Sequence, residues 1–136
     1  FCKEIEADRF YEEFMPQALE IWLERESGVT YIPYLLGSRY SQQPLKAEFL
    51  GLTHETTREE MLAALVRGLC EYQREHIKEI GADVHLKNVI HVTGGAATGA
   101  VIRAKRTWMR NCEYIPEEES SMKGAALLGK EFLEGQ

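Results

Sequence analysis

A short β-like run leads directly into a glycine-rich turn at residues 88–100, which read Asn88-Val89-Ile90-His91-Val92-Thr93-Gly94-Gly95-Ala96-Ala97-Thr98-Gly99-Ala100. Glycine has no β-carbon, so a strand that ends in Thr-Gly-Gly lets a ligand approach the backbone closely. The helix expected to follow offers amides and the positive end of its dipole, which suit a phosphate group. The turn is neither a Walker loop nor the G-x-G-x-x-G of a dinucleotide fold. From the residues alone, a nucleotide-like ligand and a turn whose glycines serve packing only are both open.

The chain after this turn alternates between helical and strand-like patterns. A helix is expected at about Ala100 to Arg110, a short strand at Cys112–Ile115, and a last helix from Ser120 or Ser121. Helices that alternate with strands are typical of a parallel sheet whose strands are joined by crossovers. The predicted fold class is therefore α/β, with short parallel strands.

The chain before the turn is expected to be mainly helical or irregular. A helix at about Ala7 to Glu26 is predicted, with a kink or break near Met15 because Pro16 interrupts the pattern. Residues 29–53 mix proline, glycine and aromatic residues without a sustained period, which favours an ordered irregular connection.

A long helix is predicted between Thr57 and Gly81. Thr57 and Glu60 have the spacing of a capping box, in which each side chain accepts from the backbone amide of the other residue. The apolar residues after them recur with a period of about 3.6. Gly81 is expected to end this helix.

The composition is that of an acidic globular protein. The 136 residues carry 16 Lys+Arg and 22 Asp+Glu, so the formal net charge is −6, and 44% of the residues are hydrophobic. This length corresponds to one domain or to one part of a larger one. The negative balance argues against a nucleic-acid or anionic-membrane partner, and no apolar run approaches the roughly 20 residues of a membrane span.

The cysteines and the first residue indicate where the protein resides and how much of it is present. The three cysteines are odd in number and widely spaced, which excludes a paired disulfide framework and favours reduced thiols in the cytoplasm: Cys2, Cys70 and Cys112. Cys70 and Cys112 occupy positions expected to be buried and inert. The chain begins with Phe1 and not with Met, so we expect a cytoplasmic protein of which this chain is an excerpt.

The predicted helix at 100–110 is basic. Arg103, Arg106 and Arg110 share one face, and Lys105 adds a fourth positive charge. This face could attract a nucleotide phosphate or a nucleic acid. The favoured interpretation is a solvated surface that neutralises itself against an acidic run downstream, which comprises Glu113, Glu117, Glu118 and Glu119.

The four histidines do not form a metal-ligand pattern. They are His54, His76, His85 and His91, and none has a second ligand three or four residues on. His91, if it faces inward, is expected to be a core histidine with a hydrogen-bond partner. No Ser–His–Asp triad follows from spacing, because such triads assemble from distant positions. The residues therefore support a nucleotide-like ligand at one glycine turn and no catalytic base.

Four segments have the form of motifs: Tyr31-Ile32-Pro33-Tyr34-Leu35-Leu36-Gly37-Ser38-Arg39, then Gly51-Leu52 to Thr57-Arg58, then Val92-Thr93-Gly94-Gly95-Ala96-Ala97, then Glu119-x-x-Met122-Lys123-Gly124-Ala125-Ala126. They resemble Y-L-P-Y-L-x-G-E-R, G-L-T-x-x-H-T-R, V-T-G-G-G-A and E-x-x-A-L-G-A-A of the FGGY family of carbohydrate kinases. Their order and spacing are similar to the family's over about residues 29–130. Kinases of xylulose and related ketoses are the nearest in kind. Ala96 stands where the family has a third glycine, Ser38 where it has glutamate, and Lys123 where it has leucine.

The resemblance implies a helix-rich fragment of an actin-like ATPase (ribonuclease H-like) domain. Chain 1–136 is then the later part of the C-terminal domain, with a helical and loop part at about 1–81. A strand, glycine loop, helix, strand and helix follow at about 86–134. In the family the glycine loop lies against the adenosine and α-phosphate of ATP, which maps onto Gly94, Gly95, Ala96 and Ala97. ATP and Mg²⁺ are the implied cofactors.

The same resemblance implies that a sugar substrate is held mainly by an N-terminal domain, which also carries the family's catalytic aspartate. Phosphoryl transfer needs such a base and Mg²⁺ on the phosphates, and nothing in this chain matches the aspartate. We therefore expect the isolated chain to be inactive, and an unpaired sheet edge to favour self-association. The alternative function is a non-catalytic interaction or regulatory module on the same actin-like scaffold.

Overall fold

The computed structural model describes residues 3–35, 37, 44–95, 97–110 and 112–134. Helices and short strands alternate along the chain in the order α1 (Ala7–Arg9), η1 (Phe10–Phe14), α2 (Met15–Trp22), β1 (Thr30–Ile32), β2 (Glu48–Leu50), α3 (Arg58–Asp83), β3 (Val89–Val92), α4 (Gly99–Trp108), β4 (Glu113–Pro116) and α5 (Ser120–Glu134). None of the described helices is long and apolar enough to cross a membrane.

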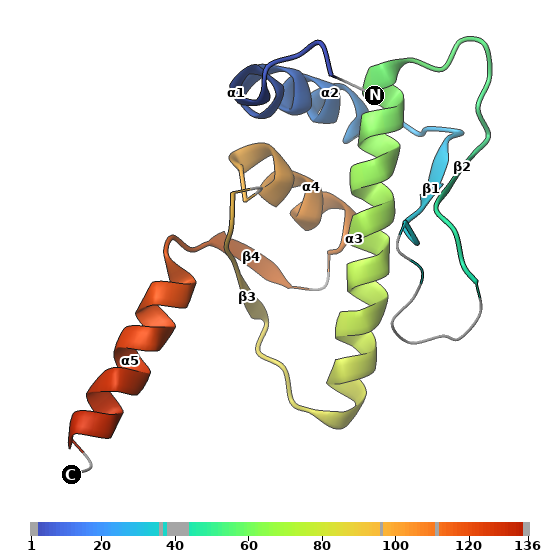
Figure 1. Cartoon of the computed structure of the whole chain (residues 1–136). Helices are drawn as coiled ribbons and strands as arrows, with labels where there is room; N and C mark the ends of the chain where they lie inside the picture. The colour runs from blue at the N-terminus through green and yellow to red at the C-terminus, as the bar shows by residue number, and fades with distance from the viewer. Residues whose placement is uncertain (1–2, 36, 38–43, 96, 111, 135–136) are drawn as a thin grey trace.

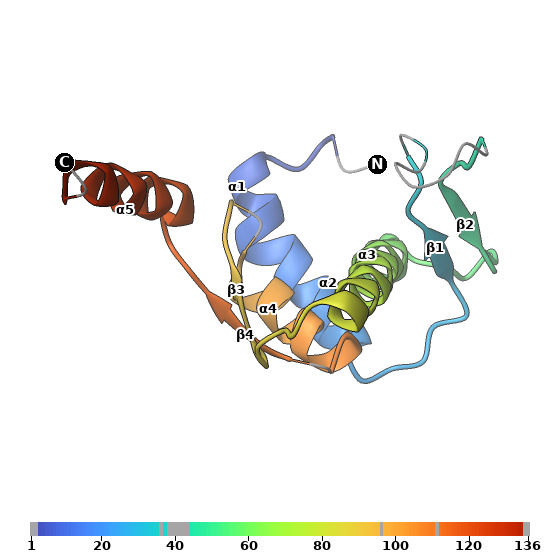
Figure 2. The ribbon, with the colours of Figure 1, turned by 90° about the horizontal axis from the view of Figure 1, so that it is seen from below.

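The long helix α3 runs through the middle of the molecule. Helices α2 and α4 pack on one side of it, and strands β1 and β2 lie on the other side (Figure 1). Strands β3 and β4 lie next to α4, whereas α5 projects away from the rest in both views (Figures 1 and 2). The apolar side chains of α5 are correspondingly exposed: Met122, Leu127, Leu128, Phe132 and Leu133.

The main core lies between α2, α3 and α4, and β4 closes it on one side. Leu19 from α2, Leu62 and Val66 from α3, and Ile102 from α4 are buried there. Tyr114 of β4 reaches the same core and is only 1% exposed. The apolar positions of three amphipathic helices therefore come together around one strand, as the helical periods predicted.

Strands β3 and β4 form a parallel pair. Val89 lies opposite Glu113, and the register continues to Val92 opposite Pro116. The backbone N–H of Glu117 then donates to the carbonyl oxygen of Val92 at 2.9 Å, just beyond the strand ends. Because α4 joins the two strands, the predicted crossover-connected α/β unit is confirmed.

The first helical segment is interrupted where the sequence predicts it. The residues before Pro16 form a single π-helical turn, η1, in which the N–H of Met15 donates to the carbonyl oxygen of Phe10. Proline cannot donate and its ring crowds the carbonyl four residues earlier, so the chain accommodates it with an extra residue per turn. The segment ends at Trp22, four residues before the predicted end at Glu26.

The prediction of a wholly irregular connection at 29–53 is wrong at its two ends. Thr30–Ile32 and Glu48–Leu50 pair as an antiparallel ribbon, with Tyr31 opposite Phe49 and their rings 4.7 Å apart. Short strands of this kind depend on a partner distant in sequence, so local periodicity does not reveal them. Leu36 and residues 38–43, which include Ser38 and Arg39 of the first motif, lie outside the described residues.

Helix α3 begins as predicted but ends later. The Thr57 hydroxyl accepts from the N–H of Glu60 at 3.2 Å, which is one half of the predicted capping box. The Glu60 carboxylate accepts from the Ser27 hydroxyl at 2.7 Å and so ties the helix to the segment before β1. Gly81 does not end the helix, which continues to Asp83, because one glycine costs a helix only about 1 kcal/mol.

Candidate functional site

The glycine turn connects the end of β3 to the start of α4. Gly94 has a φ of +104°, a conformation that side chains with a β-carbon rarely adopt. The N–H of Ala97 donates to the carbonyl oxygen of Gly94 at 2.9 Å and closes the turn. The Thr98 hydroxyl then caps α4 by accepting from the N–H of Val101 at 3.4 Å. The local sequence thus fixes both the turn and the direction in which α4 starts.

Neither Gly94 nor Gly95 is required by packing. A β-carbon built at either position would meet no atom of the described chain within 4 Å, apart from its chain neighbours. The conformation of Gly94 explains the choice of glycine there, whereas nothing in the fold explains it at Gly95. An open backbone surface of this kind suits the close approach of a ligand. Ala96, the third predicted site residue, lies outside the described residues.

The turn forms one wall of a cavity of about 460 Å³. Thr93, Gly94, Gly95 and Ala97 line this wall, and residues 116–121 line the rest of the cavity. The structure therefore places three of the four predicted site residues, Gly94, Gly95 and Ala97, at one cavity. We call it the glycine-turn cavity.

The part of the wall that follows β4 carries Glu117, Glu118 and Glu119. The carboxylate of Glu117 accepts from Nζ of Lys123 at 2.7 Å and pairs with Nδ1 of His91 at 2.6 Å. The hydrogen bond from Lys123, its charge and the nearby His91 lower the pKa of the Glu117 carboxyl group from its usual value. This wall therefore keeps its negative charge and offers hydrogen-bond acceptors.

His91 does not face inward, so the condition under which it was expected to be a core histidine is not met: 57% of its side chain is exposed and it pairs with Glu117. Sequence reasoning did not place His91, Glu117 and Lys123 together. For His91 and Glu117 a signal was available: both lie at or near the carboxyl ends of strands expected to be parallel, and such ends lie at one edge of a sheet.

The basic face of α4 does not neutralise itself against the acidic run. Among the described residues, no ion pair joins Arg103, Arg106 or Arg110 to the glutamates at 113–119. Arg106 donates to the carbonyl oxygen of Tyr114 at 2.9 Å, and Arg110 donates to that of Thr107 at 2.7 Å. The three arginines line a separate hollow of about 590 Å³ beside the end of α2, which does not include the glycine turn.

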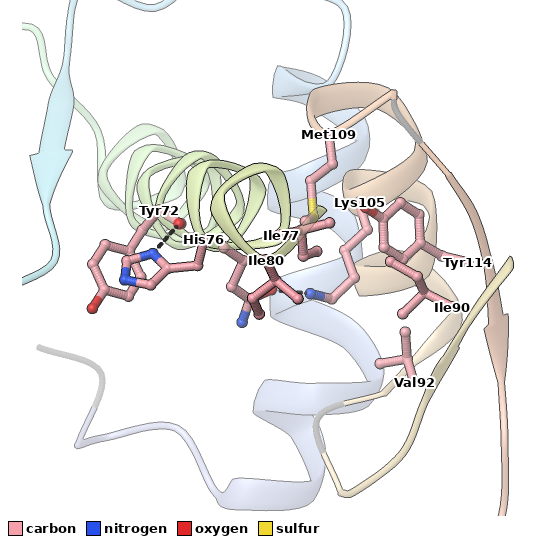
Figure 3. A pocket seen from close by; sticks show the side chains of 10 residues that line it. Tyr72, His76, Ile77, Ile80, Ile90, Val92, Lys105, Met109 and Tyr114 are labelled. Carbon is pink, nitrogen blue, oxygen red and sulfur yellow. Dashed lines mark hydrogen bonds between the residues drawn. The ribbon is translucent and has the colours of Figure 1, made fainter. Parts of the chain in front are cut away.

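A third cavity, of about 440 Å³, lies between the second half of α3 and the β3–β4 pair (Figure 3). Its lining is mostly aliphatic and aromatic, with Ile77 and Ile80 of α3 facing Ile90 and Val92 of β3. His76 lies at one rim, and its Nδ1 is 2.9 Å from the carbonyl oxygen of Tyr72. The lining suits an apolar group better than a charged ligand.

Neither Cys70 nor a cluster of possible metal ligands forms a reactive site among the described residues. Cys70 is 2% exposed, and burial raises the pKa of its thiol to about 11, so it is inert as predicted. Within the described residues, no group of three His, Cys, Asp or Glu side chains could hold a metal ion.

Comparison with known proteins places the chain in a family. Residues 2–130 match the C-terminal domain of the FGGY family of carbohydrate kinases. Among curated proteins, none shows significant similarity to the chain.

Two solved structures share the fold. A xylulose kinase from Rhodospirillum rubrum is 15% identical with a TM-score of 0.69, covering 84% of this chain and 23% of that one. A xyloylose kinase from Brucella ovis is 26% identical with a TM-score of 0.61, covering 77% of this chain and 23% of that one. The chain thus spans about a quarter of the length of each kinase. With its α/β unit and its glycine turn, this chain belongs to the FGGY family of carbohydrate kinases and has the fold of that family's C-terminal domain.

Proposed function

We propose that this chain supplies the nucleotide-binding side of the active-site cleft in an ATP-dependent kinase. The kinase transfers phosphate to a hydroxyl group of a ketose or a related sugar of the xylulose type. The family supports the sugar-kinase activity, and the names of the two similar structures support the sugar class. Residues 1–136 are the later part of the C-terminal domain, divided at about 1–81 and 86–134. The reaction takes place in the cytoplasm, where reduced thiols persist.

The observation that carries this proposal is the open glycine turn at the cavity. The family resemblance implies that Gly94, Gly95, Ala96 and Ala97 would hold the adenosine and α-phosphate, and the lack of β-carbons at 94 and 95 leaves room for such a ligand. The first turn of α4 adds amides that have no intrahelical partner, and its dipole favours the negative phosphate. The chain's own residues therefore fit a nucleotide at this place.

Mg²⁺ needs no dedicated cluster of protein ligands at this site. It binds commonly through substrate phosphates, waters and one or two carboxylates. When bound, it neutralises the charge that develops on the phosphates during transfer. The part played by this chain is to hold the nucleotide in position beside the glycine turn.

The base and the sugar pocket belong to a part of the enzyme outside these residues, so the isolated chain is inactive. The test is a coupled assay of the purified chain with ATP, Mg²⁺ and xylulose or another ketose. We expect no phosphorylation above the rate without protein. Measurable ATP-dependent phosphorylation of any ketose would contradict this division of roles.

The glycine turn itself is tested by titrating the chain with ATP and following the backbone amide signals. We expect those of Gly94, Gly95 and Ala97 to shift. Gly95→Val should weaken binding about tenfold or more without unfolding the chain, because its side chain points into space that the fold leaves open. Gly129→Val in α5 is the matched control, since a β-carbon at Gly129 also meets nothing within 4 Å and the residue lies outside the cavity lining. Unmoved amide signals, or equal losses for both variants, would sink the proposal.

We also propose that the chain self-associates when it is isolated. Its β3–β4 pair has only two parallel strands, which rarely stand alone, and the apolar cavity beside β3 is open. Light scattering after size exclusion should show a mass that rises with concentration. A constant monomer mass up to millimolar concentration would refute this.

A further inference from the structure

Three polar side chains from separate segments of the chain meet beside the glycine-turn cavity. His91 comes from β3, Glu117 follows β4, and Lys123 belongs to the first turn of α5. Both oxygens of Glu117 are engaged, one by Lys123 at 2.7 Å and the other by His91 at 2.6 Å. We call these three residues the Glu117 clip. It fixes the start of α5 to the β3–β4 edge, although the rest of α5 projects away (Figures 1 and 2).

The clip changes the charge of the cavity lining. Glu117, Glu118 and Glu119 line the same cavity as Gly94 and Gly95, and their formal charges repel an anion there. Lys123 offsets one of these charges, and His91 lies against the second oxygen of the same carboxylate. Charges within a Debye length of about 8–10 Å affect a bound anion, and Lys123 lies 2.7 Å from a carboxylate that lines the cavity.

We propose that Lys123 and His91 are positioning residues for nucleotide binding, which act through Glu117. They hold its carboxylate against the strand edge and offset its charge, so that the anionic part of a nucleoside triphosphate can enter beside Gly94 and Gly95. This inference rests on the nucleotide-binding function proposed above and adds to it a determinant of affinity. Neither residue needs to touch the nucleotide.

The decisive experiment measures the dissociation constant of Mg²⁺-bound ATP by calorimetry on the full chain at low salt. Lys123→Met removes the charge and keeps the length of the side chain, whereas Lys123→Arg keeps the charge. We expect about fivefold weaker binding for Lys123→Met, the size of one exposed ion pair, and near-normal binding for Lys123→Arg. In a Glu117→Gln background, Lys123→Met should change the affinity less than twofold, because its partner charge is gone.

A second pair of variants separates positioning from a structural role. His91→Asn removes the imidazole and should weaken binding, whereas in a Glu117→Gln background it should change the affinity less than twofold, because the carboxylate that His91 holds is gone. Circular dichroism of each variant checks that it is folded.

Three outcomes overturn the inference, and they are distinguishable. If the unchanged chain does not bind ATP, the proposed function fails and the inference fails with it. If ATP binds but Lys123→Met is equal to the unchanged chain, the inference alone fails. It also fails alone if Lys123→Met or His91→Asn loses as much affinity in the Glu117→Gln background as it does with Glu117 in place.

Discussion

Two pairs of glycines in this molecule have opposite surroundings. In the region around α3, a β-carbon at Gly68 would lie 2.3 Å from the carbonyl oxygen of Tyr31, and one at Gly51 would lie 2.1 Å from that of Gly28. At the glycine turn, β-carbons at Gly94 and Gly95 would meet nothing within 4 Å. The first pair is glycine because another part of the backbone occupies the space. The second pair leaves its space open.

This difference separates glycines that packing explains from glycines that packing does not explain. Close backbone contact at Gly68 lets β1 lie directly on α3, so the fold alone accounts for that glycine. Gly95 has neither a close neighbour nor a positive φ, and it lines a cavity. The comparison therefore weighs against the interpretation in which the turn's glycines serve packing only. The following predictions test how these two regions are packed. They run from the largest expected effect to the smallest.

Gly68→Ala should lower the free energy of unfolding by about 3 kcal/mol, the upper end for an overpacked site, because the β-carbon collides with the Tyr31 carbonyl oxygen. Gly81→Ala in the same helix is the matched control, since its β-carbon would only touch the flexible Leu86 side chain. It should raise stability by about 0.5–1 kcal/mol, the usual gain over glycine in a helix. Urea denaturation measures both. Equal stabilities of the two variants would show that β1 does not lie against α3 as described.

Cys70 should resist alkylation because it lies in the closed core. Raising its pKa from the usual 9.0 to about 11 lowers the thiolate fraction about 100-fold at pH 8, before any steric protection. Iodoacetamide labelling followed by peptide mass spectrometry should modify the half-buried Cys112 before Cys70. Labelling of Cys70 at the same rate under native conditions would mean that the core between α3 and α4 opens readily.

Gly94→Ala should destabilise the chain by about 1–2 kcal/mol, although its side chain has room, because alanine at a φ of +104° is strained. Gly95→Ala should change stability by less than about 0.5 kcal/mol, since neither space nor conformation opposes it. Thermal unfolding of the two variants under the same conditions measures the difference in their stabilities. A large loss for Gly95→Ala would restore a structural reason for that glycine.

The smallest predicted effect is on the stability of the fold at low pH. Because the folded pKa of the Glu117 carboxyl is lowered from about 4.5, chiefly by Lys123, the charged form stabilises the fold above that pH. This contribution is lost as the pH falls through the lowered folded value. Glu117→Gln should therefore flatten the decrease in stability below pH 4.5, and Glu118→Gln, at an exposed neighbour, should not. Denaturant curves between pH 3 and 6 measure the difference.

The elements that sequence reasoning found are those with local signals. Thr57 and Thr98 cap α3 and α4, Pro16 disturbs the first helix, and the apolar periods mark the buried faces. The β3–turn–α4–β4 unit was also predictable, because its glycines and its short β-like run lie next to one another in the chain. The β1–β2 ribbon was missed, since each three-residue strand is defined only by a partner in a distant part of the sequence.

Half of the candidate site could be predicted from the sequence. The glycine wall could be found by its composition, whereas the acidic wall comes from residues that follow a different strand. The exposure of His91 was also not predictable, because in a four-residue strand the face that meets the core depends on which helices cover the sheet. Its contact with Glu117 follows from the parallel register of β3 and β4, which is a tertiary fact.

The sequence by itself determined the helices, the glycine turn and the family resemblance, because each depends on residues that are neighbours along the chain. Only the tertiary structure decided that the space beside Gly94 and Gly95 is open while that beside Gly51 and Gly68 is closed. It alone also brought Lys123 and His91 to one carboxylate. The reason is physical: whether a β-carbon collides, or a charge is offset, depends on atoms from distant segments, whose positions the packing of α3, α4 and the β3–β4 pair sets.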